Sequence, residues 1–270
     1  MLYSVNALKG FSLRSRDGDI GHVRDFYFDD DHWTIRYLVA NTGSWLAHRK
    51  VLISPYALGG VSSEAGRVAV DLTRKQIEES PSLESDKPVS WQYEELYHGH
   101  FGWPMYWSGP YIWGQYPVIE RNPELWTEPA ATAHRSDSHL RSTNDVSGHH
   151  VHATDGEIGH VDDFLLDDST WAIRYLVVDT SDWWPGKKVL VTPAWIDRVS
   201  WGEREVFVDL ARNVIREAPE YVPGTPLTRE FESRLHRHYE RLGYWMDVAR
   251  DKDGGRAMSS SSDAIMGRSL

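Results

Sequence analysis

The sequence contains an internal repeat, and this repeat constrains the fold more than any other feature. The segment Asp17-Gly-Asp-Ile-Gly-His-Val23 returns as Asp155-Gly-Glu-Ile-Gly-His-Val161. The same offset, without a gap, aligns residues 33–39 with residues 171–177. Self-similarity of this kind indicates two copies of one structural unit, each about a hundred residues long.

Each unit is predicted to contain short β-strands. Asp17-Gly18 and Asp155-Gly156 stand between extended runs and supply the positive φ that a two-residue hairpin needs. From residue 33 to residue 40 the side chains alternate with a period of two, which is typical of a strand that turns one aromatic-rich face inward. Further strands are predicted over residues 51–54, 68–72, 189–192 and 206–210. Short strands at this spacing favour a small antiparallel barrel.

A helix is predicted after each set of strands, over residues 90–101 and 228–242. In both segments large apolar side chains recur at spacings of three or four, which produces one face that can pack on the barrel. These side chains are Tyr93, Tyr97 and Phe101 in the first segment and Phe231, Leu235, Tyr239 and Leu242 in the second. Thr228 is placed to cap the second helix, whereas Gly99 and Gly102 weaken the first.

The predicted fold is therefore mainly β with flanking helices: two tandem small antiparallel β-barrels, each followed by a helix. We assign residues 1–107 to the first copy and residues 140–247 to the second. Residues 108–139 contain four prolines and are predicted to be a linker, and residues 248–270, with their serine run, are predicted to be disordered. Because matching copies can cover each other's apolar surface, we expect them to pair within the chain as a pseudo-two-fold pair.

The composition limits the classes of function. The net charge is −11, and because nucleic-acid affinity depends largely on lysine and arginine, a nucleic-acid partner is not expected. The absence of cysteine excludes disulfides, thiolate metal sites and cysteine nucleophiles. No run of about 18 apolar residues predicts a transmembrane segment, and the first residues lack a signal-peptide pattern, so we expect a soluble cytoplasmic protein. The 13 tryptophans predict aromatic-rich cores.

The repeated motifs resemble the PRC-barrel family. They are Asp-Gly-x-Ile-Gly-x-Val at 17–23 and 155–161, Trp-x-Ile-Arg-Tyr-Leu-Val at 33–39 and 171–177, Lys-Val-Leu-Ile/Val-x-Pro at 50–55 and 188–193, and Val-Asp-Leu-x-Arg at 70–74 and 208–212. The family is named for the cytoplasmic domain of the photosynthetic reaction centre H subunit and is also found in a ribosome-maturation factor. The resemblance implies a non-catalytic barrel that docks to other proteins, for example in assembly or regulation of a photosynthetic electron-transfer complex. It implies no cofactor, and we transfer no functional residue.

Repeated histidines are the first candidates for chemistry. His22 is equivalent to His160, and the pair His98 and His100 is equivalent to His236 and His238. Side chains that are two residues apart on a helix point about 200° away from each other, which is poor geometry for binding one metal ion. The histidines at 149, 150 and 152 are expected to be solvated positions of an early strand. We therefore assign no metal site.

Paired carboxylates are the second candidates. Asp29-Asp30 and Asp167-Asp168 stand where a strand should turn, and such residues commonly bond the local backbone. Arg36 is expected to pair with Asp25, as Arg174 with Asp163, or to stack on a tryptophan. Because no nucleophile and base are seen together, we assign no catalytic residue and do not expect an enzyme.

The strongest candidate for function is an aromatic surface formed by the segment 101–113 and by loop tryptophans. Its members are Trp103, Tyr106, Trp107, Tyr111, Trp113, Trp45, Trp183 and Trp184. If these rings are exposed, they mark a protein-binding surface; otherwise they form a strap packed between the two copies. The sequence leaves both arrangements open.

We therefore predict an adaptor or assembly protein with a protein partner that the sequence does not identify. Two other classes stay open. One is a small-ligand or metal-binding module, and the other is an accessory factor of the ribosome or of RNA processing.

Overall fold

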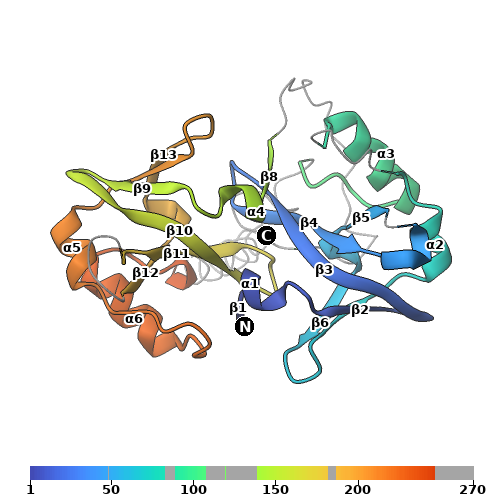
Figure 1. The fold of residues 1–270 in the computed structure, drawn as a ribbon, viewed down its shortest axis with the longest axis horizontal. Coiled ribbons are helices and arrows are strands. Elements are labelled where there is room, and N and C mark those ends of the chain that lie inside the picture. Colours follow the sequence, from blue (N-terminus) through green and yellow to red (C-terminus); the bar gives the residue numbers. More distant parts are fainter. Residues whose placement is uncertain (48, 83–88, 108–118, 120–138, 182–186, 247–270) are drawn as a thin grey trace, which may run out of the picture.

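The computed structural model describes residues 1–47, 49–82, 89–107, 119, 139–181 and 187–246. These residues form two seven-stranded sheets that lie side by side, with short helices around them (Figure 1). The predicted tail and all of the predicted linker except Ile119 and His139 lie outside the described residues.

The first sheet has the strand order β5-β4-β3-β2-β7-β6, with β8 paired to β3. Its strands are β2 (Ser12–Ser15), β3 (Gly18–Asp29), β4 (Thr34–Asn41), β5 (Lys50–Ile53), β6 (Leu58–Ser62), β7 (Arg67–Val70) and β8 (Leu140–Ser142). The strands predicted at 51–54 and 68–72 are thus present as β5 and β7. We call the described residues up to 107 the first half, so β8 comes from the other part of the chain.

The second sheet repeats this order with the equivalent strands, β12-β11-β10-β9-β14-β13, and with β1 paired to β10. Its strands are β1 (Leu2–Ser4), β9 (His150–Ala153), β10 (Gly156–Asp167), β11 (Ile173–Asp179), β12 (Lys188–Val191), β13 (Ile196–Ser200) and β14 (Glu205–Val208). We call the described residues from 140 onward the second half, so β1 comes from the first half.

The sheets are mixed, so the prediction of purely antiparallel barrels is wrong in this respect. β2 pairs with β7, and β9 with β14, in parallel, whereas the other pairs are antiparallel. A parallel pair needs a long connection, which the four strands between its members supply. Among the described residues no pairing joins the two ends of either strand order, so each sheet is open in its hydrogen bonding.

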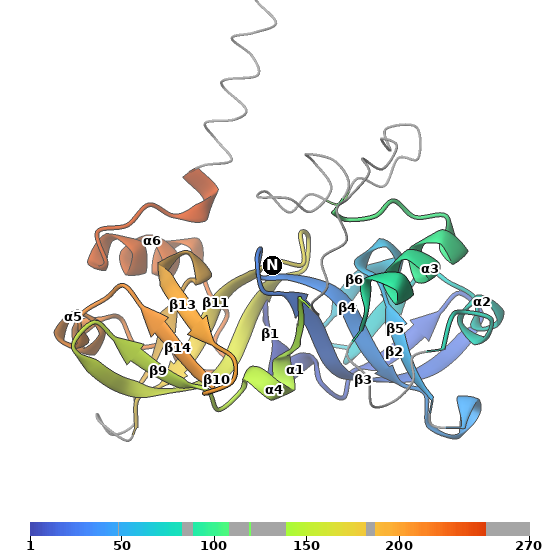
Figure 2. The ribbon, with the colours of Figure 1, turned by 90° about the horizontal axis from the view of Figure 1, so that it is seen from above.

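Short helices flank the sheets. They are α1 (Val5–Leu8), α2 (Arg74–Glu78), α3 (Trp91–Phe101), α4 (Thr143–Val146), α5 (Arg212–Glu217) and α6 (Arg229–His238). The helices predicted after each set of strands are α3 and α6, capped by the side chains of Ser90 and Thr228. α6 ends before the predicted boundary, so Leu242 falls off the apolar stripe and is 64% exposed. Both helices lie on the same side of the molecule (Figure 2).

The first hairpin of each half is where it was predicted, with a different loop. Ser15 pairs with Gly18, so the two loop residues are Arg16 and Asp17. Gly156 has the expected positive φ of 139°, but Gly18 does not have a positive φ. The glycine that matters more is Gly21, which has φ 118° and would carry a Cβ only 2.0 Å from the carbonyl oxygen of Asn41. Glycine is therefore required where β3 crosses closest to β4.

β4 is buried on both faces rather than on one. Every residue from Thr34 to Ala40 is buried. Ile35, Leu38 and Ala40 join the large core, whereas Tyr37 and Val39 pack in a second cluster with residues of α3. α3 therefore covers the face of β4 that would be exposed to solvent if the strand were buried on one side only. Trp33 precedes the strand in a left-handed turn with φ 52°.

The two halves exchange their N-terminal arms, which we define as residues 2–8 and 140–146. β1 pairs antiparallel with β10, and β8 pairs antiparallel with β3, so each arm adds a strand to the sheet of the other half. The short helices α1 and α4 lie at the junction (Figure 2). Division of the chain at residues 107 and 140 therefore cuts two sheets that are each built from both segments.

Buried aspartates hold these arms. Asp25 on β3 accepts hydrogen bonds from Ser142 Oγ at 2.6 Å and from Thr143 Oγ1 at 2.8 Å. Asp163 on β10 accepts in the same way from the Ser4 hydroxyl and, at 3.0 Å, from the backbone N–H of Asn6. A buried carboxylate needs such donors, so the arms and the aspartates depend on each other.

One apolar core runs through the junction. The largest cluster of buried side chains includes residues of both halves. Phe28 and Phe164 lie 6.0 Å apart between ring centroids. The backbone N–H of Ile35 donates to Trp171, and that of Ile173 donates to Trp33, both at 2.8 Å. Continuous burial of this kind predicts that the halves unfold together. No helix in the described part of the chain is long and apolar enough to span a membrane.

Candidate functional site

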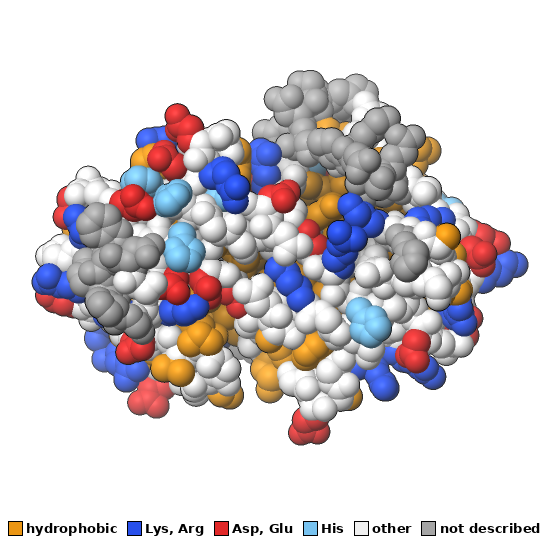
Figure 3. Space-filling view, viewed as in Figure 1, with side chains coloured by type: hydrophobic (Ala, Val, Ile, Leu, Met, Phe, Trp, Pro, Cys, Tyr) orange, Lys and Arg blue, Asp and Glu red, His pale blue; other side chains and the backbone are white. Residues whose placement is uncertain are grey.

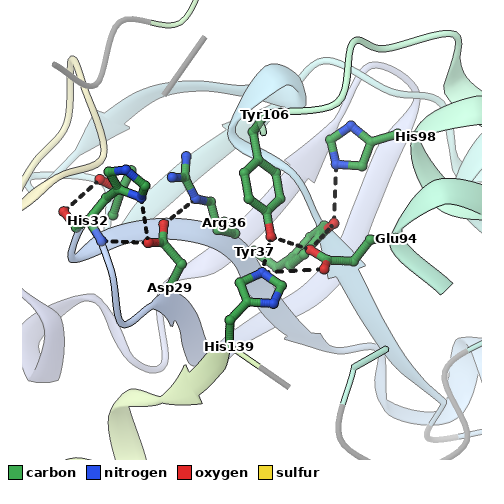
Figure 4. Close-up of polar contacts among 9 residues, drawn as sticks. Asp29, His32, Arg36, Tyr37, Glu94, His98, Tyr106 and His139 are labelled. Carbon is green, nitrogen blue, oxygen red and sulfur yellow. Dashed lines mark hydrogen bonds and ion pairs between the residues drawn. The ribbon is translucent and has the colours of Figure 1, made fainter. Parts of the chain in front are cut away.

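A cluster of largely buried polar side chains lies between the first sheet and α3 (Figure 4). It connects the end of β3, β4, one face of α3, the segment after α3 and the residue before β8. Its members are Asp29, Arg36, Tyr37, Glu94, His98, Tyr106 and His139. Ser90 caps α3, and the helical repeat then places Glu94 and His98 one turn apart on the face toward β4.

Glu94 is the centre of the cluster. The hydroxyl oxygens of Tyr106 and Tyr37 lie 2.7 and 3.1 Å from its Oε1, and His139 Nε2 lies 3.5 Å from its Oε2. Tyr106 also hydrogen-bonds His139. Burial raises the pKa of Glu94 to about 8, because the tyrosine hydroxyls and Arg36 compensate only part of the desolvation. Glu94 therefore carries a proton at neutral pH.

The contacts of His98 agree with a protonated Glu94. Burial lowers the pKa of His98 to about 4, so its imidazole is neutral and has one N–H. Its Nδ1 lies 2.9 Å from the carbonyl oxygen of Pro104, which can only accept, so Nδ1 carries that hydrogen. Nε2, 3.1 Å from the Tyr37 hydroxyl, then accepts the tyrosine proton. A proton on Glu94 completes the remaining contact between Glu94 and Tyr37.

The second part of the cluster is a buried ion pair. Arg36 Nε lies 2.5 Å from Asp29 Oδ2, and the guanidinium lies 4.2 Å from the ring centroid of Tyr106. Burial by itself raises the pKa of Asp29, but Arg36 and His32 outweigh it and lower that pKa. The backbone N–H of His32 also donates to Asp29 at 2.6 Å, which confirms that this aspartate bonds the local turn.

The predicted partners of the two arginines are wrong. Arg36 pairs with Asp29 rather than Asp25, and Arg174 pairs with Asp167 at 3.3 Å rather than with Asp163. Arg36 is the unpaired residue at the register shift between Tyr27 and Phe28, close to Asp29 at the end of β3, and Arg174 is unpaired in the same way in β11. Asp25 and Asp163, the expected aspartates, stand opposite Val39 and Val177. The expected aspartates therefore bind the exchanged arms instead, and the rings over the arginines belong to tyrosines.

The second half contains an equivalent cluster at the positions that the repeat relates to the first. Its members are Asp167, Arg174, Tyr175, Glu232, His236 and Tyr244. The hydroxyl oxygens of Tyr175 and Tyr244 lie 3.0 and 2.9 Å from Glu232 Oε1. The same polar contacts therefore attach α6 to β11.

The two clusters differ beside the central glutamate, where the first contains His139 and the second, among the described residues, has no equivalent member. In the first half Trp91 stacks on His139 with ring centroids 3.7 Å apart. The equivalent residue in the second half is Arg229, whose Nη1 lies 3.0 Å from Glu232 Oε2. An aromatic ring closes the first cluster, whereas a guanidinium closes the second.

The chemistry of these clusters is that of a structural network. The buried polar atoms bond one another and fasten each helix to its sheet. Within the described ranges no three histidine, aspartate or glutamate side chains are grouped so that they could hold a metal ion. His98 is buried and His100 is exposed, as two residues apart on a helix predict.

The structure describes four of the eight members of the predicted aromatic surface. Tyr106 is buried in the first cluster, and Trp103 stacks on Phe101 with centroids 4.4 Å apart. Trp107 contacts Trp91 edge to face at 4.6 Å. These rings pack on the first half, and Trp103 and Trp107 keep part of their surface exposed. They do not form a strap between the halves.

The other members of that surface lie elsewhere. Trp45 is half-buried in a 3-10 turn (Gly43–Leu46), beneath the guanidinium of Arg74 at 4.5 Å. Tyr111, Trp113, Trp183 and Trp184 lie outside the described residues.

Comparison with known families identifies the N-terminal part of the chain. Residues 1–77 match the family model of the PRC-barrel domain. The chain contains a PRC-barrel domain. The matched PRC-barrel residues extend from β1 through β7 and end within α2. No curated protein matches the chain. Asp29, Arg36 and Tyr37 belong to the matched residues, whereas α3, with Glu94 and His98, follows them.

The centres of both clusters were not among the residues predicted from the sequence. Glu94 and Glu232 are identical across the repeat and sit inside segments predicted to be amphipathic helices. A carboxylate that recurs on the apolar side of a helix in both copies is the signal that could have found them. Tyr37 and Tyr175 were noted only as inward-facing strand residues.

Proposed function

We propose that this PRC-barrel protein is a cytoplasmic, non-enzymatic adaptor that holds a protein partner through the aromatic rings after α3. The observation that carries the proposal is the half-buried placement of Trp103 and Trp107 on the first half. Tryptophan rings that keep part of their surface in solvent on a rigid support are typical of binding hot spots.

The comparison between halves supports this assignment. The residues equivalent to Trp91 and Trp103 are Arg229 and Arg241. Arg241 forms an ion pair with Asp209 at 2.9 Å, so the second half has a charged surface where the first half has aromatic rings. Trp107 recurs as Trp245, so the aromatic surfaces of the two halves differ at the positions of Trp91 and Trp103.

The buried clusters support a non-enzymatic role. Their titratable groups, with Glu94 and His98 as the most buried, are engaged with one another beneath α3 and α6. Groups that hold helices to sheets in this way serve stability, since a reacting substrate needs access to them.

We also infer that the halves are related as the subunits of a symmetric dimer are. The support is reciprocity: the contacts that hold one arm at the junction recur, at positions related by the repeat, for the other arm. The arm of each half pairs with the long strand of the other, and Asp25 and Asp163 hold equivalent residues of the two arms. Contacts repeated in this manner are the property of an isologous interface.

A pull-down with the full chain tests the adaptor role. The tagged wild type is compared with Trp107→Ala, and the matched control is Trp201→Ala, which removes a half-buried tryptophan from the second half. We expect a defined partner that Trp107→Ala loses and Trp201→Ala retains. If both variants bind the same proteins as the wild type, the aromatic rings are not the binding site.

A further inference from the structure

The outer faces of the two sheets carry opposite charge at equivalent positions. In each sheet a row of residues crosses five neighbouring strands as direct Cα partners. The row of the second half is Glu205, His150, His160, Asp179 and Lys188. The row of the first half is Arg67, Ser12, His22, Asn41 and Lys50. Partners in register point to the same face of a sheet, and all of these residues are at least partly exposed.

Three substitutions between the rows change the charge. Where the first row has Arg67 and Asn41, the second row has Glu205 and Asp179 at the positions that the repeat aligns. The residue at the bulge beside each row changes from Arg24 to Asp162. In the second half Lys188 Nζ lies 2.7 Å from Asp162 and 3.4 Å from Asp179, so its charge is compensated there.

The first row is therefore basic and the second is acidic. With its bulge residue, the first row has the cations of Arg24, Lys50 and Arg67 and no carboxylate. The second has three carboxylates and one lysine. A local basic face stands out on a chain with a net charge of −11.

The strands at the middle of both rows lie on the same side of the molecule. β2 and β3 of the first half and β9 and β10 of the second half lie at the front in Figure 1, with α1 and α4 between them. Figure 2 shows these strands on the side opposite to α3 and α6. In Figure 3, histidine side chains are visible over β9 and β10, next to acidic side chains, and a histidine is visible over β2 and β3.

We propose that a second copy of this chain docks on this side, so that the basic row of each copy meets the acidic row of the other. A two-fold axis perpendicular to the line between the halves places the first half of one copy over the second half of its partner. Both contacts then form at once, and the assembly closes as a dimer. Complementary charge supplies the specificity of this pairing, which does not depend on the aromatic surface or on the adaptor role.

The test is the mass of the full chain in solution, measured by light scattering after size exclusion. We expect a dimer at about 50 mM salt and a monomer at about 1 M, because the screening length shrinks from more than 10 Å to about 3 Å. The double variant Arg24→Glu/Arg67→Glu makes both rows acidic, and Asp162→Arg/Glu205→Arg makes both rows basic, so each variant alone should be monomeric. An equimolar mixture of the two should form a mixed dimer, because every row then meets one of opposite sign.

The control is Arg234→Glu/Arg237→Glu, the same charge change at two exposed positions of α6 on the other side of the molecule. It should stay dimeric, and the three variants should keep the circular dichroism spectrum and unfolding midpoint of the wild type. A wild type that is monomeric at low salt at a concentration on the order of 100 µM overturns the proposal. Dimers of Arg24→Glu/Arg67→Glu alone, or a mixture that stays monomeric, overturn it as well.

Discussion

Glu94→Gln should remove a pH dependence from the stability of this protein. The fully buried carboxyl of Glu94 has a pKa raised from 4.5 to about 8, whereas in the unfolded chain it titrates near 4.5. Below pH 4.5 both states bind the proton, and there is no difference. Between the two values the folded state binds more protons than the unfolded state, so the free energy of unfolding falls as pH rises. Above about pH 8 both states are ionised, and the loss is complete.

The magnitude follows from the two pKa values. Each pH unit within the interval changes the free energy of unfolding by at most about 1.4 kcal/mol. The whole interval between 4.5 and about 8 therefore contributes at most roughly 5 kcal/mol. Glutamine has nearly the shape of the protonated acid and an N–H that can donate to Tyr37 in place of the acid proton, but it does not titrate.

Urea unfolding at pH 5, 6, 7 and 8 measures the effect. Histidines and other groups titrate in the wild type and the variant alike, so the informative quantity is the difference between the two proteins at each pH. We expect the wild type to lose stability relative to Glu94→Gln as pH rises. The matched control is Glu95→Gln, the neighbouring exposed glutamate of α3, which should follow the wild type. A constant difference between wild type and Glu94→Gln from pH 5 to pH 8 would refute the assignment of a buried neutral acid.

Three further changes test the fold. Gly21→Ala places a Cβ 2.0 Å from a β4 carbonyl oxygen and should lower the free energy of unfolding by about 2–4 kcal/mol. Gly60→Ala, with open space around the added methyl group, should lower it by less than about 1 kcal/mol, and urea unfolding measures both variants. Asp25→Ala leaves the hydroxyl donors of the exchanged arm without their acceptor, so amide hydrogen exchange should accelerate in residues 140–146 before the rest of the chain. Unchanged protection of these residues would contradict the role of Asp25. Tyr37→Phe removes the hydroxyl between Glu94 and His98 and should lower the free energy of unfolding by about 1–3 kcal/mol in the same assay. An unchanged free energy of unfolding would show that this network adds nothing to stability.

Much of the local structure could be predicted from residue patterns. Hairpins at residues 17 and 155, two of the later strands in each half and the helices after them follow from turn residues and apolar periodicity, which act over a few residues. The resemblance to the PRC-barrel family rested on motifs of the same kind, and the family match over residues 1–77 agrees with it. The predictions were wrong where they depended on the register between strands, as for the partners of Arg36 and Arg174. Arg36 is itself the unpaired residue at a register shift between β3 and β4, near Asp29, whereas Asp25 stands opposite Val39.

The candidate site could be predicted only in fragments. His98 and Tyr106 were noticed because they recur in the repeat, but Glu94 was not, since a lone glutamate in a helical segment normally marks a solvated face. Its burial results from the packing of α3 on β4, and its pKa depends on the tyrosines of two other segments. Such a contact network brings together residues far apart in the chain, and no local pattern contains it.

The duplication, the secondary structure of each unit and the aromatic character of the cores are determined by the sequence itself, because they depend on identity, spacing and side-chain type. Only the tertiary structure decided that the arms cross between the halves, that one core runs through both, and that β2 and β3 lie on the same side of the molecule as β9 and β10. The physical reason is that a strand such as β1 can satisfy its backbone hydrogen bonds on either sheet. The choice between its own half and the other depends on burial and on buried acceptors such as Asp163, which exist only once both sheets have formed.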